Sequence, residues 1–116
     1  QAKQKAIAEA TARKEKLVAA AKASKEKMVS TAKTSADKVI AEAEAQAAAL
    51  QAKATNPIAK AAAKKSGDAL ISKARTQANK IIADAEANGN KMITDAETKG
   101  DAMIKKASET KPGENK

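Results

Sequence analysis

The sequence contains no cysteine, histidine, phenylalanine, tyrosine or tryptophan, and these absences limit what the chain can be. Without Cys and His it lacks the ligands for disulfides, zinc fingers and the common haem sites. Only 17 of its 116 residues are large and aliphatic: eight Ile, three Leu, three Val and three Met. Aromatic side chains carry much of the buried area of compact cores. The composition therefore argues against a globular enzyme domain and leaves a helical or a disordered protein.

Proline occurs only twice, and Pro57 divides the chain. It follows Asn56, a preferred N-cap residue, and proline suits the first position of a helix. The remaining sequence is dominated by strong helix formers, including 32 alanines. We predict an all-α, antiparallel two-helix hairpin over residues 1–108. Its expected parts are a first helix at about 2–54, a turn at 55–57, a second helix at about 57–108, and a polar flexible tail at 109–116.

The apolar residues recur every eleven positions. In the second half this step links Leu70-Ile71, Ile81-Ile82, Met92-Ile93 and Met103-Ile104, and also Gly67, Ala78, Gly89 and Gly100. In the first half it links Ala6-Ile7, Leu17-Val18, Met28-Val29 and Val39-Ile40, and then Leu50. Eleven residues over three turns give about 3.67 residues per turn, which favours a right-handed supercoil. The sequence therefore predicts hendecad (11-residue repeat) coiled-coil packing.

A hairpin centred near residue 57 pairs positions whose numbers sum to about 114. Ala43 then faces Ile71, and Ile40 faces Ala74, so a large residue meets a small one as a dense core requires. At the fourth site of each repeat the expected pairs are Ala36 with Ala78, Ala47 with Gly67, Lys25 with Gly89 and Lys14 with Gly100. Glycine costs about 1 kcal/mol in a helix. We expect these glycines to make room for the opposite helix and for a lysine stem.

We call the line of repeated residues along which the two helices meet the seam. A single hairpin leaves this apolar seam half covered. The last part of the first helix is rich in alanine on all sides and has only Glu44 and Lys53 as charged residues between positions 43 and 54. We expect this surface to pair hairpins into a four-helix bundle, or else to be simply a helix end of high propensity. Self-association, or association with another helical protein, is the predicted kind of partnership.

No residue pattern predicts catalysis, cofactor binding or a metal site. Ser66 follows Lys64-Lys65, but we interpret it as a polar residue beside a seam glycine rather than a Ser–Lys dyad. The carboxylate pairs Glu42/Glu44, Asp84/Glu86 and Asp95/Glu97 are two residues apart on a helix and point in different directions. Ion pairs are expected instead with lysines four residues on, as in Asp95 with Lys99 and Asp101 with Lys105. The three methionines are expected to fill the seam.

The net charge of +9 comes from 23 basic and 14 acidic residues, and 21 of the basic residues are lysine. The excess is spread over both helices, with acids interleaved. Without aromatics to stack on bases, and with two arginines, the sequence argues against nucleic-acid recognition. Weak attraction to an anionic surface, including acidic lipid headgroups, remains a prediction. No run of about 18 apolar residues suggests a membrane span.

Two resemblances add to this interpretation. The strings Lys80-Ile81-Ile82-Ala83-Asp84-Ala85 and Val39-Ile40-Ala41-Glu42-Ala43 resemble the hendecad helices of rotary ATPase peripheral-stalk subunits, although those helices are unidirectional and this chain breaks at Asn56-Pro57. The string Lys14-Glu15-Lys16-Leu17-Val18 is similar to late-embryogenesis-abundant desiccation proteins. The first resemblance implies a long structural helix, and the second a hydrophilic protein that folds on drying.

We therefore predict a non-catalytic structural or protein-interaction coiled coil that acts as a spacer, scaffold or stalk. The alternatives are a Lys-rich protein that binds polyanions or membrane surfaces, and a stress-protective helical protein. The lack of cysteine and the start at Gln1 lead us to expect an exported or envelope-associated protein.

Overall fold

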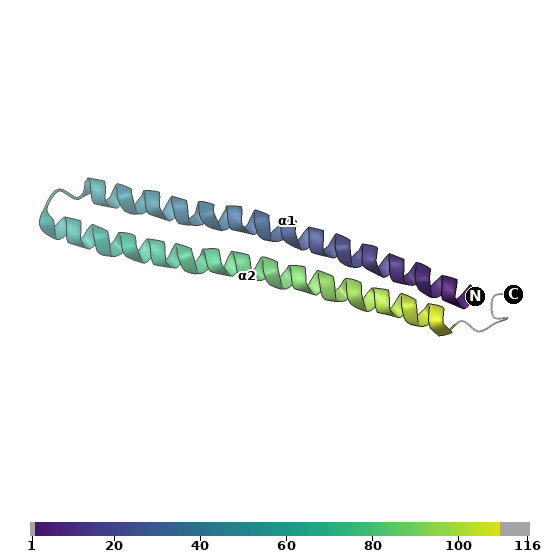
Figure 1. Ribbon diagram of the computed structural model, residues 1–116. Helices are drawn as coiled ribbons and strands as arrows, with labels where there is room; N and C mark the ends of the chain where they lie inside the picture. The colour runs from purple at the N-terminus through teal and green to yellow at the C-terminus, as the bar shows by residue number, and fades with distance from the viewer. Residues whose placement is uncertain (1, 110–116) are drawn as a thin grey trace. The chain divides into compact units, whose positions relative to one another are not determined.

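The computed structural model describes residues 2–109 and contains two α-helices (Figure 1). Helix α1 spans Ala2–Lys53 and helix α2 spans Pro57–Glu109. No strand occurs between residues 2 and 109. The predicted all-α helical hairpin is confirmed, and the expected helix bounds differ from the observed ones by a single residue at each C-terminal end. Glu109, placed in the predicted tail, ends α2, and the rest of that tail lies outside the described residues.

The chain divides into two compact units, each built from a piece of both helices. The turn unit comprises Val29–Ala85 and holds the connection between the helices. The end unit comprises Gln1–Met28 and Glu86–Lys116. Within the end unit, Lys14 lies against Gly100 and Lys25 against Gly89, so the two helix segments run antiparallel. Within the turn unit, Ala47 lies against Gly67, which shows the same antiparallel pairing.

The connection at residues 54–56 is short because both helix ends satisfy their own backbone groups. The Ala54 amide donates to the Gln51 carbonyl at 3.2 Å, a tighter turn that ends α1. The Asn56 side-chain oxygen accepts a hydrogen bond from the Ala59 amide at 2.8 Å, and its carbonyl accepts one from the Lys60 amide at 2.8 Å. Asn56 is thus the N-cap of α2 and Pro57 its first residue, as the sequence indicated.

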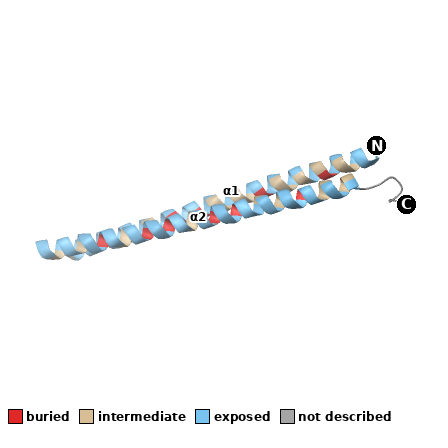
Figure 2. Ribbon diagram, turned by 90° about the horizontal axis from the view of Figure 1, so that it is seen from below, coloured by how far each residue is buried: buried red, intermediate tan, exposed pale blue. Residues whose placement is uncertain are grey.

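The core of both units consists of alanine and glycine. Among residues 2–109, all twelve buried residues are of these two types: Ala10, Ala21, Ala32, Ala36, Ala43, Ala47, Gly67, Ala74, Ala78, Ala85, Gly89 and Gly100. They lie where α1 and α2 meet (Figure 2). No polar or charged residue is buried in the part of the chain that the structure describes. The helices therefore approach closely through their smallest side chains.

The large aliphatic residues flank this line of small residues instead of filling it. Most are half-buried, but Leu50 and Met92 retain 38% and 37% of their surface exposed. The expectation that the methionines fill the seam is therefore only partly met, since Met28 and Met103 are half-buried and Met92 is exposed. The physical reason is that two helices bury only the residues along their line of contact. A side chain beside that line keeps one of its sides exposed to water.

Candidate functional site: two lysine clasps in the end unit

The most specific side-chain arrangement in the molecule involves the seam glycines. A Cβ atom added to Gly67 would lie 2.9 Å from the Ala47 Cβ. One added to Gly89 would lie 2.8 Å from the Lys25 Cβ, and one added to Gly100 would lie 2.6 Å from the Lys14 Cβ. These distances are too short for any side chain to fit unchanged. The three pairings predicted from the sequence are confirmed, and each glycine makes room for a residue of α1.

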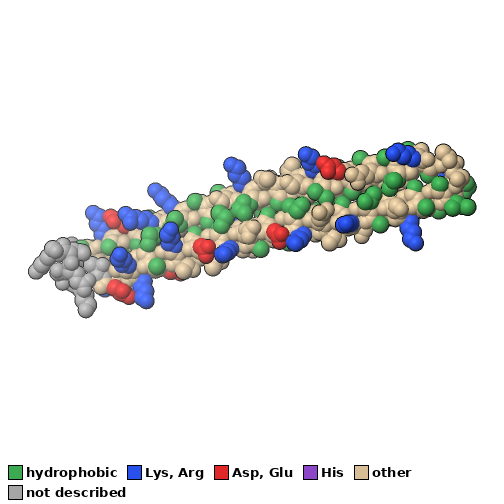
Figure 3. Space-filling model, turned by 180° about the vertical axis from the view of Figure 1, so that it is seen from behind, with side chains coloured by type: hydrophobic (Ala, Val, Ile, Leu, Met, Phe, Trp, Pro, Cys, Tyr) green, Lys and Arg blue, Asp and Glu red, His purple; other side chains and the backbone are tan. Residues whose placement is uncertain are grey.

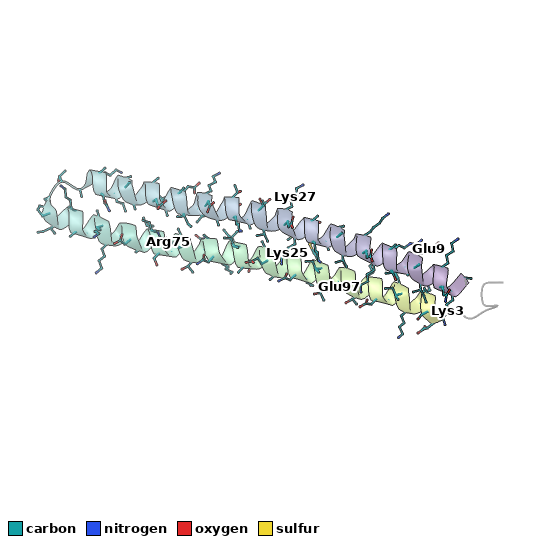
Figure 4. All side chains as sticks on the ribbon, viewed as in Figure 1. Lys3, Glu9, Lys25, Lys27, Arg75 and Glu97 are labelled. Carbon is teal, nitrogen blue, oxygen red and sulfur yellow. The ribbon has the colours of Figure 1, made fainter. Side chains whose placement is uncertain are left out.

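In the end unit, each lysine that crosses a glycine is held at its head group by the next residue of α2. The Lys14 ammonium pairs with the Asp101 carboxylate at 2.6 Å, and Asp101 follows Gly100. The Lys25 ammonium donates a hydrogen bond to the Asn90 side-chain oxygen at 2.5 Å, and Asn90 follows Gly89. We call each set of lysine, glycine and acceptor a lysine clasp. Figure 4 shows Lys25 reaching from α1 toward α2, whereas Lys27 points away.

The Lys14 clasp is electrostatically favourable for the charged ammonium. The hydrogen bond that the Lys14 ammonium donates to the Asp101 carboxylate is the largest cause that raises the pKa of Lys14 above its ordinary value of 10.5. Partial desolvation opposes this rise, while the charges of Asp101 and Glu97 add to it. The Lys14 side chain is 30% exposed and that of Asp101 is 65% exposed. An ion pair this accessible to water contributes orientation more than stability.

The structure corrects the predicted charge partner of Asp101. The sequence suggested a pair with Lys105 on the same helix, but the recorded partner is Lys14 on the other helix. Between residues 2 and 109 no ion pair joins Asp95 to Lys99 either. Same-helix pairs of this kind contribute only about 0.2–0.5 kcal/mol. A lysine already held over a glycine therefore competes well for the carboxylate, because less of its freedom remains to be lost.

The acceptor residues of the clasps were missed by sequence reasoning, although a signal was present. Each small seam residue of α2 is followed by Asp or Asn at the same eleven-residue step: Asp68, Asn79, Asn90 and Asp101. Only the last two face a lysine, since Ala47 and Ala36 occupy the matching sites nearer the turn. A clasp could therefore be predicted where a lysine in the first helix faces a glycine in the second helix and that glycine is followed by Asp or Asn.

The other groups that the sequence singled out all lie at the surface. Ser66 and the lysines before it are exposed, as are the carboxylate pairs considered above. Among residues 2–109 no three acidic side chains come together in a way that would hold a metal ion. An open hollow of about 430 Å³ beside the Lys14 clasp is lined by both Lys22 and Glu97, together with Val18 and Ile104. Its opposite charges give it no preference for an anion or a cation.

Comparison with known proteins identifies no relative. No protein-family model, no curated protein and no solved structure matches the chain. In the portion described, neither α1 nor α2 has a stretch that is long and apolar enough to cross a membrane.

Proposed function

We propose that the chain is a non-catalytic structural or protein-interaction module in which a helical hairpin acts as a spacer, scaffold or stalk. The observation that carries this proposal is the seam itself. In both units α1 packs against α2 through small residues, and each seam glycine faces one particular residue of α1. These contacts recur at eleven-residue spacing and fix the register of the two helices. Specific pairing of this kind is what a preformed mechanical or docking element needs.

The outward faces support the same proposal. Between residues 2 and 109 no polar or charged residue is buried, and Figure 3 shows lysine, arginine and acidic side chains projecting on both sides of the apolar seam. A second copy of the hairpin, or another helical protein, is the proposed partner. Of the eight alanines between residues 41 and 54, five are exposed: Ala41, Ala45, Ala48, Ala49 and Ala52. They form the proposed contact surface for hairpin pairing.

The test is sedimentation equilibrium together with circular dichroism of the full chain in dilute buffer, over a range of concentrations. We expect a strongly helical species with a cooperative thermal transition and a mass of one or two chains. A transition temperature that rises with concentration would indicate pairing of hairpins. A mostly disordered monomer would overturn the proposal and favour the stress-protective alternative, in which the chain folds on drying.

A salt series separates the proposal from the polyanion-binding alternative. Hairpin pairing through uncharged alanines should change little with ionic strength. Binding of a generic polyanion through lysines weakens steeply as salt is added, because the Debye length shortens to about 8 Å at physiological ionic strength.

A further inference from the structure

The turn end of the hairpin exposes a large aliphatic side chain inside a basic, acid-free segment. Ile58, the second residue of α2, keeps 85% of its surface exposed, more than Leu50 or Met92, the other two exposed large apolar residues in the described chain. No acidic residue occurs between Glu44 and Asp68, the longest such interval in the sequence. That interval contains four lysines: Lys53, Lys60, Lys64 and Lys65.

All of these groups are presented to solvent within the turn unit. The four lysines are exposed, and on α2 the exposed residues Ile58, Ala61, Ala62 and Lys65 recur at the three- and four-residue spacing of one helix face. The opposite side of this helix segment is covered, since Ala59 and Ala63 are half-buried and Gly67 is buried. Figure 3 shows hydrophobic side chains reaching the turn end of the two helices.

Ile58 is held in this exposed position by the cap of α2. Pro57 fixes the backbone of the first helical residue, and Asn56 accepts the hydrogen bond from the Ala59 amide at 2.8 Å. The isoleucine therefore cannot turn inward without breaking the first turn of the helix. With the exposed Ala61 and Ala62 on the same face, Ile58 forms an apolar patch, and such a patch is a candidate contact for another surface.

We propose that this turn-end patch, comprising Ile58 and the lysines 53, 60, 64 and 65, docks on an anionic lipid surface. The four lysines attract the headgroups, and Ile58, which shares its helix face with Lys65, enters the boundary of the acyl region. The patch carries a charge of +4 with no acid, so two copies would repel each other there. For nucleic acid, the patch has no aromatic residue to stack on bases and no arginine to bind the edge of a guanine.

This docking goes beyond the proposed function, because a spacer needs no lipid contact. It also differs from uniform attraction of a basic protein to an anionic surface. The difference is positional: only the turn end should respond to substitution. Lys80 lies fifteen residues from Lys65 on the same helix, about 22 Å away at 1.5 Å per residue, well beyond a Debye length at physiological salt.

The test measures partition of the full chain onto vesicles of phosphatidylcholine mixed with phosphatidylserine, with vesicles of phosphatidylcholine alone as the comparison. We expect binding to the mixed vesicles only. Ile58→Ser should weaken it about tenfold, because the aliphatic contact is lost. Lys65→Glu should weaken it about twentyfold, because two units of charge change on the face that carries Ile58. The matched control Lys80→Glu, also exposed, should leave it nearly unchanged.

A tryptophan reporter gives an independent readout, because the natural chain has none. The fluorescence of Ile58→Trp should shift to the blue when mixed vesicles are added, and that of Ser30→Trp, at another exposed site, should not. No binding at low salt, or equal weakening by Lys65→Glu and Lys80→Glu, would overturn the proposal. A blue shift that grows with protein concentration in the absence of vesicles would also overturn it, in favour of self-association at the turn. Circular dichroism of each variant, which should match that of the parent chain, separates these outcomes from a failure to fold.

Discussion

At the scale of single residues, the seam glycines of α2 allow close packing because they have no side chain. Gly89 and Gly100 occupy positions where an added Cβ would overlap the first carbons of Lys25 and Lys14. Glycine inside a helix is unfavourable by about 1 kcal/mol relative to alanine. The lysine stem recovers part of this cost by covering apolar surface while its ammonium stays in water.

The clasp predicts that the effect of Gly89→Ala depends on the side chain at position 25. In the parent chain Gly89→Ala should lower the free energy of unfolding by roughly 1 kcal/mol, because overpacking costs about 1–3 kcal/mol and exceeds the helix-propensity gain of about 1 kcal/mol. In a Lys25→Ala background the contacts with the Lys25 Cγ and Cδ atoms are gone and only the Cβ contact at 2.8 Å remains, so the same change should cost less than in the parent chain. Urea denaturation of the four proteins measures both effects. An equal effect of Gly89→Ala in both backgrounds would contradict the clasp.

The Lys14 clasp predicts a pKa that depends on Asp101. Asp101→Asn should lower the pKa of Lys14 toward its ordinary value of 10.5, since the largest cause of its rise is removed. A ¹⁵N NMR titration of the Lys14 side chain measures the pKa directly. Asp95→Asn is the matched control and should leave it unchanged. A pKa that is the same in all three proteins would contradict the clasp.

The raised pKa also sets the sign of a pH effect on stability. Because the pKa of Lys14 is higher in the folded than in the unfolded chain, its contribution is fully present below pH 10.5 and is lost as the pH rises through the folded value. The difference in unfolding free energy between the parent chain and Asp101→Asn should therefore be constant near neutral pH and shrink in this alkaline range.

At the scale of elements, the pairing of α1 with α2 follows one numerical rule. The contacts of Gly67, Gly89 and Gly100 all join residues whose numbers sum to 114. An eleven-residue step keeps this rule over successive layers, because each layer advances both helices by three whole turns. Asn56 and Pro57 place the start of α2 and so select the sum.

A designed disulfide tests this register in the turn unit. In Ala47→Cys combined with Gly67→Cys, the two Cβ atoms start 2.9 Å apart, and the helices need to separate by about 1 Å to reach the usual Cβ distance. We expect rapid oxidation to an intramolecular disulfide, measured by mass spectrometry and electrophoresis of the oxidised monomer.

The control for the disulfide uses an exposed position next to the seam. Ala47→Cys with Ala69→Cys keeps one cysteine in place and moves the other off the seam, because Ala69 is exposed. Its intramolecular oxidation should be much slower. Equal rates for the two pairs would indicate that the helices slide or separate.

At the scale of the whole molecule, the two units are not equally well packed. Eight of the twelve buried residues belong to the turn unit and four to the end unit. The turn unit has alanine on α1 at the positions that face the small residues of α2, whereas the end unit has Lys14 and Lys25 there. A lysine side chain that is partly wet excludes water less completely than an alanine contact does.

This difference predicts unequal protection from hydrogen exchange. Backbone amides near Ala36 and Ala78 in the turn unit should exchange more slowly than those near Lys14 and Gly100 in the end unit, because local opening exposes more buried surface in the turn unit. Hydrogen–deuterium exchange with mass spectrometry or NMR measures this contrast. In Lys14→Ala, which gives the end unit an alanine–glycine layer like that of Ala47 and Gly67, the contrast should diminish. Faster exchange in the turn unit would contradict this account of the packing.

Much of this fold is determined by the sequence alone, because the repeat is strict and the break is single. The eleven-residue step, together with Asn56 and Pro57, determined the two helices, their antiparallel pairing and the residue that faces each seam glycine. Helix periodicity and capping act through the backbone and the nearest carbons, where few arrangements are possible.

Only the tertiary structure decided where the longer side chains end. It placed the Lys14 ammonium on Asp101, left Asp101 without its expected same-helix partner, and put the large aliphatics beside the core instead of within it. It also exposed Ile58, which no periodicity singled out. The physical reason is that a lysine or isoleucine reaches several positions of similar energy, and the choice among them depends on how closely the second helix approaches.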